Sequence, residues 1–306
     1  MKISLCLLVK DEERTIEDCL APIHDLFDEI LVTDTGSTDR TCELLRERFG
    51  VTPDHGSLEE RQCFAKFEAR NRLIERARHP WILFLDADER LGRDEAAALL
   101  DAPDHPAVSG YFCAWDTYVD GVKIEDYKLS LFRRDARYSG LVHENTQQHL
   151  RRHGLRAEWR DGMAIRHYPE AAKLAVKRRL YRSRLECALA HDGAWYRYHW
   201  FMGYMLYRGG EAQQAARCLA QVVAARPRAF PVECLNSHMV LARLHAERGE
   251  SDAALDVLSS ALEFYGEMAD DFEVRVNFRL RPWLDGAAAA CRDGRPDLIR
   301  VYGFSC

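Results

Sequence analysis

The stretch Trp-Ile-Leu-Phe-Leu-Asp-Ala-Asp-Glu (residues 81–89) decides the fold of this chain. Its five consecutive apolar residues predict a strand that is buried on both faces, as in a parallel sheet. The carboxylates of Asp86 and Asp88 then lie in the loop that follows this strand. In open α/β sheets such loops line the crevice where ligands bind.

The sequence before this stretch alternates between strand and helix patterns. Residues 3–9 and 29–33 are apolar runs of strand length, and residues 15–26 carry apolar side chains at helical spacing. A later helix is stopped by Pro80. This alternation predicts an α/β fold with a mostly parallel, Rossmann-like sheet.

Shorter runs of β-strand character follow the acidic loop and elaborate the same sheet: YFCAW (111–115), YKLSLF (127–132) and MAIRHY (163–168). From Ala171 onward the pattern is helical, and residues 173–184 are rich in Lys and Arg. We interpret this basic segment as a helical connector packed on one face, with contact to a nucleic acid or a lipid surface as the alternative.

An internal repeat occupies the last third of the chain. The segment RGGEAQQAARCLAQVV (208–223) matches ERGESDAALDVLSSAL (247–262). Small residues at the matched positions allow two antiparallel helices to approach closely, as in tetratricopeptide repeats. We therefore predict three parts: an α/β domain over residues 1–168, a basic helical connector over 169–192, and an all-α, tetratricopeptide-like domain over 193–306.

Composition excludes several classes of protein. The chain has 306 residues, of which 47% are hydrophobic and 30% charged, a balance typical of globular proteins. Its ten cysteines include no C-x-x-C pair, which disfavours a disulfide framework or a zinc knuckle. No apolar run has the length of a membrane span, so we expect a cytoplasmic protein. Residues 1–150 hold 19 Lys and Arg against 30 Asp and Glu, a surplus of carboxylates that can hold a divalent cation.

Four residues form the main candidate site: Asp34, Arg70, Asp86 and Asp88. Asp34 and Asp86 fall at the ends of predicted strands, where a carboxylate can accept hydrogen bonds from a base or a ribose. The Asp-x-Asp turn offers two hard oxygen ligands for Mg²⁺ or Mn²⁺ bridging two phosphates. Arg70, between Phe67 and Leu73 on its helix, can reach the crevice. The remaining histidines, His167 among them, share no ligand spacing and are interpreted as packing or surface residues.

Four segments together resemble the family-2 glycosyltransferases of the GT-A fold: ISLCLLVKDEE (3–13), ILVTDTGSTDRT (30–41), EARNRLIERARHPWILFLDADER (68–90) and LFRRDARYSGLVHE (131–144). With the helical repeats, they resemble one branch more closely. This branch contains bacterial peptide S- and O-glycosyltransferases with tetratricopeptide domains, and is related to lipopolysaccharide-core sugar transferases.

The resemblance implies a nucleotide-sugar donor, a divalent cation and inversion at the anomeric carbon. It implies that Asp34 and the backbone around Leu8 hold the uracil or ribose, that Asp86 contacts the ribose, and that Asp88 binds the metal. Many family members have a second Asp at the position of Thr35. The contact to the base therefore rests on Asp34 alone.

The segment around Gly140-Leu-Val-His-Glu matches the part of this branch that returns to the active site. His143 then completes the metal site or touches the diphosphate, and Glu144 deprotonates the acceptor. Asp116 is the alternative base. Arg133 is a candidate for neutralising the diphosphate, with a solvated cation at a strand edge as the equal alternative.

Together with these residues, the resemblance implies an inverting, metal-dependent transferase that moves a hexose from a UDP-sugar to a nucleophilic acceptor, a peptide or protein side chain. One alternative acceptor is a lipid-linked glycan or a lipopolysaccharide-core saccharide, with the basic helix against an anionic membrane surface. Another alternative is a non-catalytic scaffold that recruits a partner through its repeats. The repeats also suit acceptor binding or homodimer formation, and no nucleic acid partner is expected.

Overall fold

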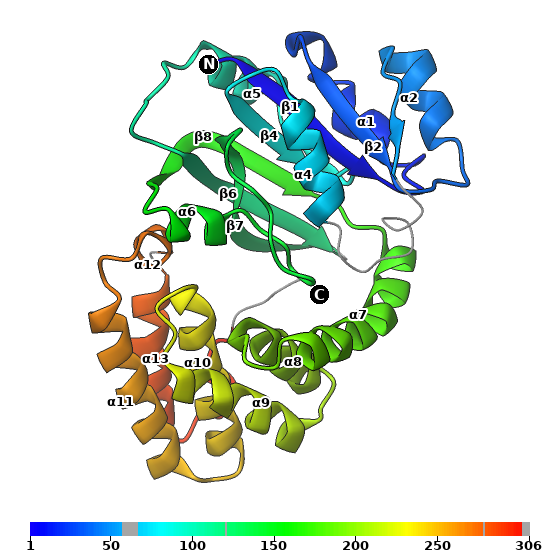
Figure 1. Cartoon of the computed structure of the whole chain (residues 1–306). Coiled ribbons are helices and arrows are strands. Elements are labelled where there is room, and N and C mark those ends of the chain that lie inside the picture. The colour runs from blue at the N-terminus through cyan, green and yellow to red at the C-terminus, as the bar shows by residue number, and fades with distance from the viewer. Residues whose placement is uncertain (57–66, 120, 278, 302–306) are drawn as a thin grey trace. The chain divides into compact units, whose positions relative to one another are not determined.

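The computed structural model describes residues 1–56, 67–119, 121–277 and 279–301, with the side chains of residues 171–179 outside the description. The chain forms two compact units (Figure 1). The first comprises Met1–Ala175 and the second begins at Val176. The predicted boundaries after residues 168 and 192 stay predictions.

Within the described residues, unit 1 contains one sheet of eight strands in the order β3-β2-β1-β4-β7-β6-β8-β5. The strands are β1 (Ile3–Val9), β2 (Ile30–Asp34), β3 (Asp54–His55), β4 (Trp81–Leu85), β5 (Glu89–Arg90), β6 (Gly110–Val119), β7 (Val122–Arg133) and β8 (Ala157–His167). Strands β3, β2, β1 and β4 run parallel, and β6 runs parallel to β8. Strand β7 is antiparallel to both β4 and β6, and β5 is antiparallel to β8. The prediction of a mostly parallel α/β sheet is thus confirmed, with antiparallel pairs in its second half.

The helices of unit 1 connect these strands. They are α1 (Ile16–Leu20), α2 (Thr41–Phe49), α4 (Phe67–Arg76), α5 (Arg93–Asp101) and α6 (Gln147–Arg152). The helical pattern expected over residues 15–26 forms a shorter helix, α1, followed by a 3₁₀ turn at His24–Leu26. Pro22 interrupts that pattern, because proline has no backbone N–H to donate within a helix.

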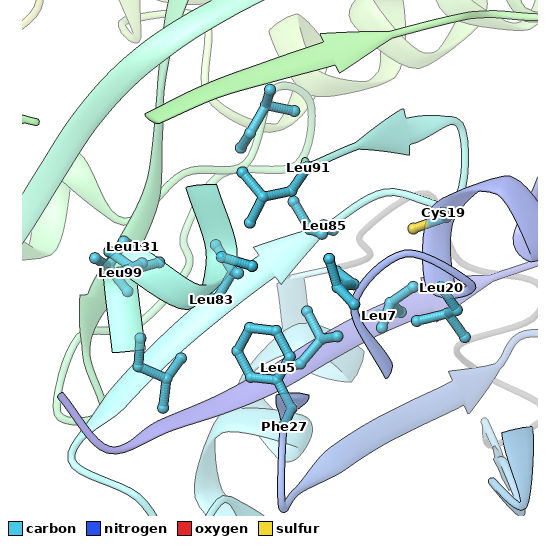
Figure 2. Close-up of a cluster of buried hydrophobic side chains, with 14 of the residues drawn as sticks. Leu5, Leu7, Cys19, Leu20, Phe27, Leu83, Leu85, Leu91, Leu99 and Leu131 are labelled. Atoms are coloured by element: carbon cyan, nitrogen blue, oxygen red, sulfur yellow. The ribbon is translucent and has the colours of Figure 1, made fainter. Parts of the chain in front are cut away.

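The core of unit 1 lies against the two central strands, β1 and β4. All five side chains of β4 are buried, as the unbroken apolar run predicts. Figure 2 shows Leu5 and Leu7 of β1 beside Leu83 and Leu85 of β4, covered by Cys19 and Leu20 of α1 and by Leu99 of α5. This packing fixes β1 and β4 side by side, so the loops at their carboxyl ends emerge together.

Unit 2 is helical. After α7 (Ala171–His191), which spans the boundary between the units, it contains α8 (Tyr196–Arg208), α9 (Ala212–Ala225), α10 (Pro231–Glu247), α11 (Ser251–Glu267), α12 (Phe272–Val276) and α13 (Leu280–Arg292). The predicted repeat corresponds to the pairs α8–α9 and α10–α11. Gly210 and Gly249, which the repeat places at equivalent positions, both have left-handed backbone conformations, with φ of 80° and 78°. A Cβ on Gly203 of α8 would lie 2.7 Å from Leu219 Cγ of α9, so these two helices are in close contact. The predicted all-α repeat domain is confirmed.

The basic segment over residues 173–184 lies within α7. Its side chains up to residue 179 are outside the described part of the structure, while Leu180 is 47% exposed. Among the described residues, no helix combines the length and the apolar character that crossing a membrane requires.

Candidate functional site

The first carboxylate of the acidic turn, Asp86, lies between two cations from different elements. Arg70 Nη2 of α4 donates to Asp86 Oδ1 at 3.0 Å, and Lys128 Nζ of β7 donates to Asp86 Oδ2 at 3.1 Å. The sheet order explains the meeting, because β7 pairs with β4 and α4 leads into β4. The structure thus brings the two predicted residues Arg70 and Asp86 together, with Lys128 as an additional member, and contact of Arg70 with a base or phosphate stays a prediction.

The charges of this group support one another. Burial disfavours the ionised form of Asp86, but Lys128 and Arg70 outweigh it and hold the pKa of Asp86 well below its ordinary value. Burial likewise disfavours the charge on Lys128, but Asp86 and Glu89 raise the pKa of Lys128 above its ordinary value. The cluster therefore keeps an ionised Asp86 at the edge of the crevice.

Glu144 joins the same cluster through Arg70. Arg70 Nε lies 3.4 Å from Glu144 Oε1, and the guanidinium stacks over the ring of Phe84 at 4.5 Å from its centroid. The preceding residue, His143, has a left-handed backbone with φ of 52°, which is uncommon for residues other than glycine. This turn places Glu144 beside Arg70 of α4, and the role of Glu144 as the base stays a prediction.

The second carboxylate of the turn, Asp88, faces an imidazole. His167 Nε2, at the end of β8, lies 3.4 Å from Asp88 Oδ2. Its other nitrogen, Nδ1, is 3.0 Å from Thr117 Oγ1. The ring stacks on Trp115, with centroids 4.9 Å apart and planes inclined by 18°. When Nδ1 donates its proton to Thr117, the Nε2 lone pair points toward Asp88.

The pair of Asp88 and His167 fits a divalent cation. Their side chains are 11% and 12% exposed, and a carboxylate oxygen with an imidazole nitrogen suits Mn²⁺. Thr117 orients the imidazole through its contact with Nδ1, as outer partners of metal-binding histidines do. Across the described residues, no group of three or more His, Cys, Asp and Glu side chains is arranged to hold a metal ion. Cations that bind with phosphates commonly use one or two protein ligands and complete their coordination with phosphate oxygens and water. His143 as a metal ligand stays a prediction.

Glu89, directly after the turn, is fully buried. Its Oε1 accepts hydrogen bonds from Lys128 Nζ at 2.5 Å and from Trp115 Nε1 at 2.7 Å. Its Oε2 accepts from the backbone N–H of Asp86 at 2.9 Å. Burial raises the pKa of Glu89, and Lys128 opposes this shift. Both oxygens of this buried carboxylate thus accept hydrogen bonds, from one charged and two neutral donors, as burial requires.

Asp34, the last residue of β2, organises its own loop. Its carboxylate accepts from the backbone N–H groups of Gly36 and Ser37 and from the Ser37 hydroxyl, and His55 Nδ1 lies 3.5 Å away. The residue is 2% exposed. The proposed contact between Asp34 and a nucleobase stays a prediction, and the structure assigns the carboxylate a role in shaping the turn.

The loops after β1 and β2 are joined to each other. The Asp11 N–H donates to Ser37 Oγ, and the Thr38 N–H donates back to Asp11 Oδ1 at 2.7 Å. Asp11 has a left-handed backbone, with φ of 54°. Leu8, half-buried near the end of β1 and paired in register with Thr33, lies directly before these loops. Contact between the backbone around Leu8 and a uracil or ribose stays a prediction.

Asp116 lies on β6 between Trp115 and Thr117, and successive side chains of a strand point to opposite faces. Trp115 and Thr117 contact Glu89 and His167, so Asp116 points to the other face. Its carboxylate lies 2.9 Å from Lys123 Nζ. Asp116 as the base stays the alternative to Glu144.

Arg133 is not brought to the cluster. It pairs in register with Trp81, at the opposite end of β4 from Asp86. Its guanidinium binds Asp104, with Nη2 2.6 Å from Oδ1, and stacks over the ring of Trp81. Arg133 is therefore a largely buried cation paired with Asp104 and is not solvated, and a role for it at the diphosphate stays a prediction.

Three members of the site were not predicted as such: Lys128, Glu89 and His167. Lys128 is a lone basic residue in the strand YKLSLF, and Glu89 directly extends the acidic turn. His167 is the second-last residue of the run MAIRHY, and it is far from Asp88 in the sequence, so the sequence does not indicate that the two side chains are close. A charged residue within or at the end of an apolar strand was the available indication.

The comparisons with known proteins show the family of the chain. The model of the family described as glycosyl transferase family 2 matches residues 4–168. A TPR repeat-containing protein of Synechococcus elongatus is 31% identical over 274 residues, which cover 86% of this chain and 66% of that protein. The SPbeta prophage-derived glycosyltransferase SunS of Bacillus subtilis is 30% identical over 143 residues, covering 46% of this chain and 32% of SunS.

Among solved structures, the chain is similar to S. aureus TarS 1-349 in complex with UDP-GlcNAc. The identity is 15%, the TM-score is 0.47, and the match covers 98% of this chain and 90% of TarS 1-349. The chain spans less than two thirds of the length of the two relatives from Synechococcus and Bacillus. Because the family model matches more than half of the chain, and the sheet and repeats are those that its sequence predicts, this protein belongs to glycosyl transferase family 2.

Proposed function

We propose that this protein transfers a hexose from a UDP-sugar to a nucleophilic acceptor, with inversion at the anomeric carbon and with Mn²⁺ or Mg²⁺ bound. The observation that carries the proposal is the acidic turn after β4. There Asp88 faces His167, and Asp86 is paired with Arg70 and Lys128. Membership of glycosyl transferase family 2 supports a sugar donor.

Each side chain has a role that follows from its contacts. Asp86, held by Arg70 and Lys128, presents its carboxylate to the ribose hydroxyls. Asp88 and His167 would hold the cation, which when bound offsets negative charge on the diphosphate. The crevice edge formed by the linked loops of Asp11 and Ser37 provides a fixed wall for the nucleoside.

The transfer needs a base as well as a donor site. The acceptor nucleophile forms a bond to the anomeric carbon, while the bond from this carbon to the diphosphate oxygen breaks and its electron pair leaves with UDP. Glu144, bound to the same arginine as Asp86, takes the proton that the acceptor loses. Asp116 is the second candidate for this role.

For the acceptor we propose a peptide or protein side chain, bound with the help of the helical repeats. The support is the repeat unit itself, since stacked helix pairs offer extended surfaces for polypeptides. A lipid-linked glycan or a saccharide core is the alternative acceptor, which the exposed Leu180 on the basic helix α7 favours. Homodimer formation through the repeats is a further proposal.

The donor half of the proposal is tested by thermal unfolding with a panel of nucleoside diphosphates and nucleotide sugars, each with and without Mn²⁺. Ligands that bind the native state raise the melting temperature by mass action. We expect stabilisation by UDP ligands that depends on Mn²⁺ and is lost in Asp88→Ala. Asp101→Ala, an exposed carboxylate at the end of α5, serves as the matched control. Absence of any shift with the parent protein would overturn the proposal and favour the scaffold.

The acceptor half is tested by incubating the protein with the donor found in that panel and with peptide or lipid-linked acceptors. A gain of one hexose on a peptide, detected by mass spectrometry and absent in Glu144→Gln, supports the peptide acceptor. Transfer to a lipid-linked saccharide alone, together with binding to anionic vesicles, supports the alternative.

A further inference from the structure

Glu89 occupies a central place in the site without facing the crevice. Its side chain is fully buried, yet its two oxygens contact Lys128, Trp115 and the backbone of Asp86. The Glu89 N–H also donates to the Asp86 carbonyl at 2.9 Å. The residue therefore closes the acidic turn through both its backbone and its side chain.

Two chains of contacts lead from Glu89 to the two carboxylates of the turn. The first passes through Lys128, whose ammonium bridges Glu89 Oε1 and Asp86 Oδ2. The second passes through Trp115, whose indole is fixed by Glu89 and whose ring stacks on His167. His167 in turn lies against Asp88 Oδ2. One buried side chain thus contacts Lys128, the partner of Asp86, and reaches His167, the partner of Asp88, through Trp115.

We propose that Glu89 is a positioning residue, which sets the orientation of both carboxylates of the Asp86-Ala87-Asp88 turn for the diphosphate donor. The inference rests on the proposed function of the turn. It does not give Glu89 any contact with substrate, because the side chain is enclosed by protein.

The chemistry of its neighbours explains why a carboxylate is needed here. An ammonium, an indole N–H and a backbone N–H all donate, and a carboxylate has acceptors on both oxygens. The amide of glutamine has the same shape but carries donors on one end. One of the three neighbours would then face another donor, and the unmatched contact would displace Lys128, Trp115 or the turn.

The matched control is Glu29, which directly precedes β2 and so lies at the amino end of the parallel strands. It is also buried, and its carboxylate accepts from the Arg78 N–H at 2.8 Å, from Arg78 Nε at 2.7 Å and from the Ser4 hydroxyl. Both residues therefore bind three donors in the same unit. Glu29→Gln and Glu89→Gln test the same kind of perturbation, once away from the turn and once beside it.

The experiment measures UDP binding by calorimetry, with and without Mn²⁺, in the parent protein and in both variants. For Glu89→Gln we expect an affinity lower by about tenfold or more, a free energy of about 1.4 kcal/mol. We also expect a higher Mn²⁺ concentration for half-maximal stabilisation by UDP, a readout that a general loss of stability does not move. Glu29→Gln should lower the melting temperature but leave both quantities unchanged.

The outcomes separate this inference from the proposed function. If the parent protein does not bind UDP, the proposed function of the site is wrong. If the parent binds and Glu89→Gln binds as tightly, with the same dependence on Mn²⁺, only the positioning role is overturned. Where Glu89→Gln does not fold, Trp115→Phe removes one donor to Glu89 and retains a ring beside His167. In that variant we again expect a higher Mn²⁺ concentration for half-maximal stabilisation by UDP, and an unchanged concentration would overturn the role.

Discussion

Arg70 on α4 and Asp86 after β4 form an ion pair, with Nη2 3.0 Å from Oδ1, at the edge of the sheet where the parallel strands end. The same guanidinium also lies near Glu144, a residue of a loop much later in the chain. A single arginine therefore links the carboxylate proposed to bind the donor with the carboxylate proposed to activate the acceptor. Its position on a helix that packs against β1 and β2 keeps both at a fixed separation.

Replacing Arg70 with methionine tests this link. Asp86 would lose a charged donor and Glu144 would lose an ion-pair partner, which we expect to cost about 2 kcal/mol in the free energy of unfolding. Urea denaturation measures this loss. Because Asp86 would keep only Lys128, we also expect weaker binding of UDP in calorimetry.

Arg137→Met is the control for Arg70→Met. Arg137 is a partly exposed arginine whose Nε lies 3.8 Å from Glu75 Oε1, so its loss should leave UDP binding unchanged. Equal affinities for UDP in the Arg70 variant and the parent would contradict the proposed role of the pair.

Arg133→Met tests the other predicted arginine. The ion pair of Arg133 with Asp104 and its stacking on Trp81 lie at the far end of β4, so we expect stability to fall by about 1 kcal/mol. The affinity for UDP should be unchanged, since no part of this contact reaches Asp86. Reduced UDP binding at unchanged stability would restore Arg133 to the donor site.

The strands and the acidic turn could be predicted because their information is local. Five apolar residues followed by Asp86 and Asp88 predict a buried strand with carboxylates at its end, and the structure has this arrangement. The repeat could be predicted for the same reason, since Gly210 and Gly249 lie at equivalent turns. Hydrophobic run length and turn residues act within a few positions of each other.

The partners of the turn could not be predicted because they depend on strand order and register. Lys128 lies beside Asp86 because β7 pairs antiparallel with β4. His167 lies beside Asp88 because β8 pairs with β5. Arg133 shows the same limit. It lies on the same strand as Lys128, but antiparallel pairing carries it to the other end of the sheet. The register between strands is a property of the assembled sheet and cannot be predicted from the composition of a single strand.

His238 in unit 2 predicts a dependence of stability on pH. The side chain is fully buried on α10, its Nδ1 donates to the Cys234 carbonyl at 2.8 Å, and Ser260 Oγ lies 3.3 Å from Nε2. Burial, with a smaller effect of Arg226, lowers the pKa of His238 from 6.5 to about 4. The unfolded chain therefore binds a proton more readily than the folded chain between these values, and stability falls as the pH falls through this range.

The loss attributed to His238 should approach about 3 kcal/mol when the pH falls from about 7 to about 4. Urea denaturation across this range measures it, in the parent and in His238→Asn. Asparagine can retain the hydrogen bond to the Cys234 carbonyl but does not titrate, so the variant should lose less stability on acidification. Identical pH dependence in the two proteins would show that other groups control it.

Gly203→Ala tests the close contact between α8 and α9. A Cβ at this position would lie 2.7 Å from Leu219 Cγ and 3.1 Å from Cys218 Cβ, so the helices would have to separate. We expect overpacking to reduce the free energy of unfolding by about 2 kcal/mol. The matched control is Gly286→Ala within α13, where a Cβ meets nothing within 4 Å. There the higher helix propensity of alanine should raise stability by up to about 1 kcal/mol. Opposite signs in urea denaturation would confirm that the glycine of α8 is required for packing of the repeat, whereas stabilisation in both variants would contradict it.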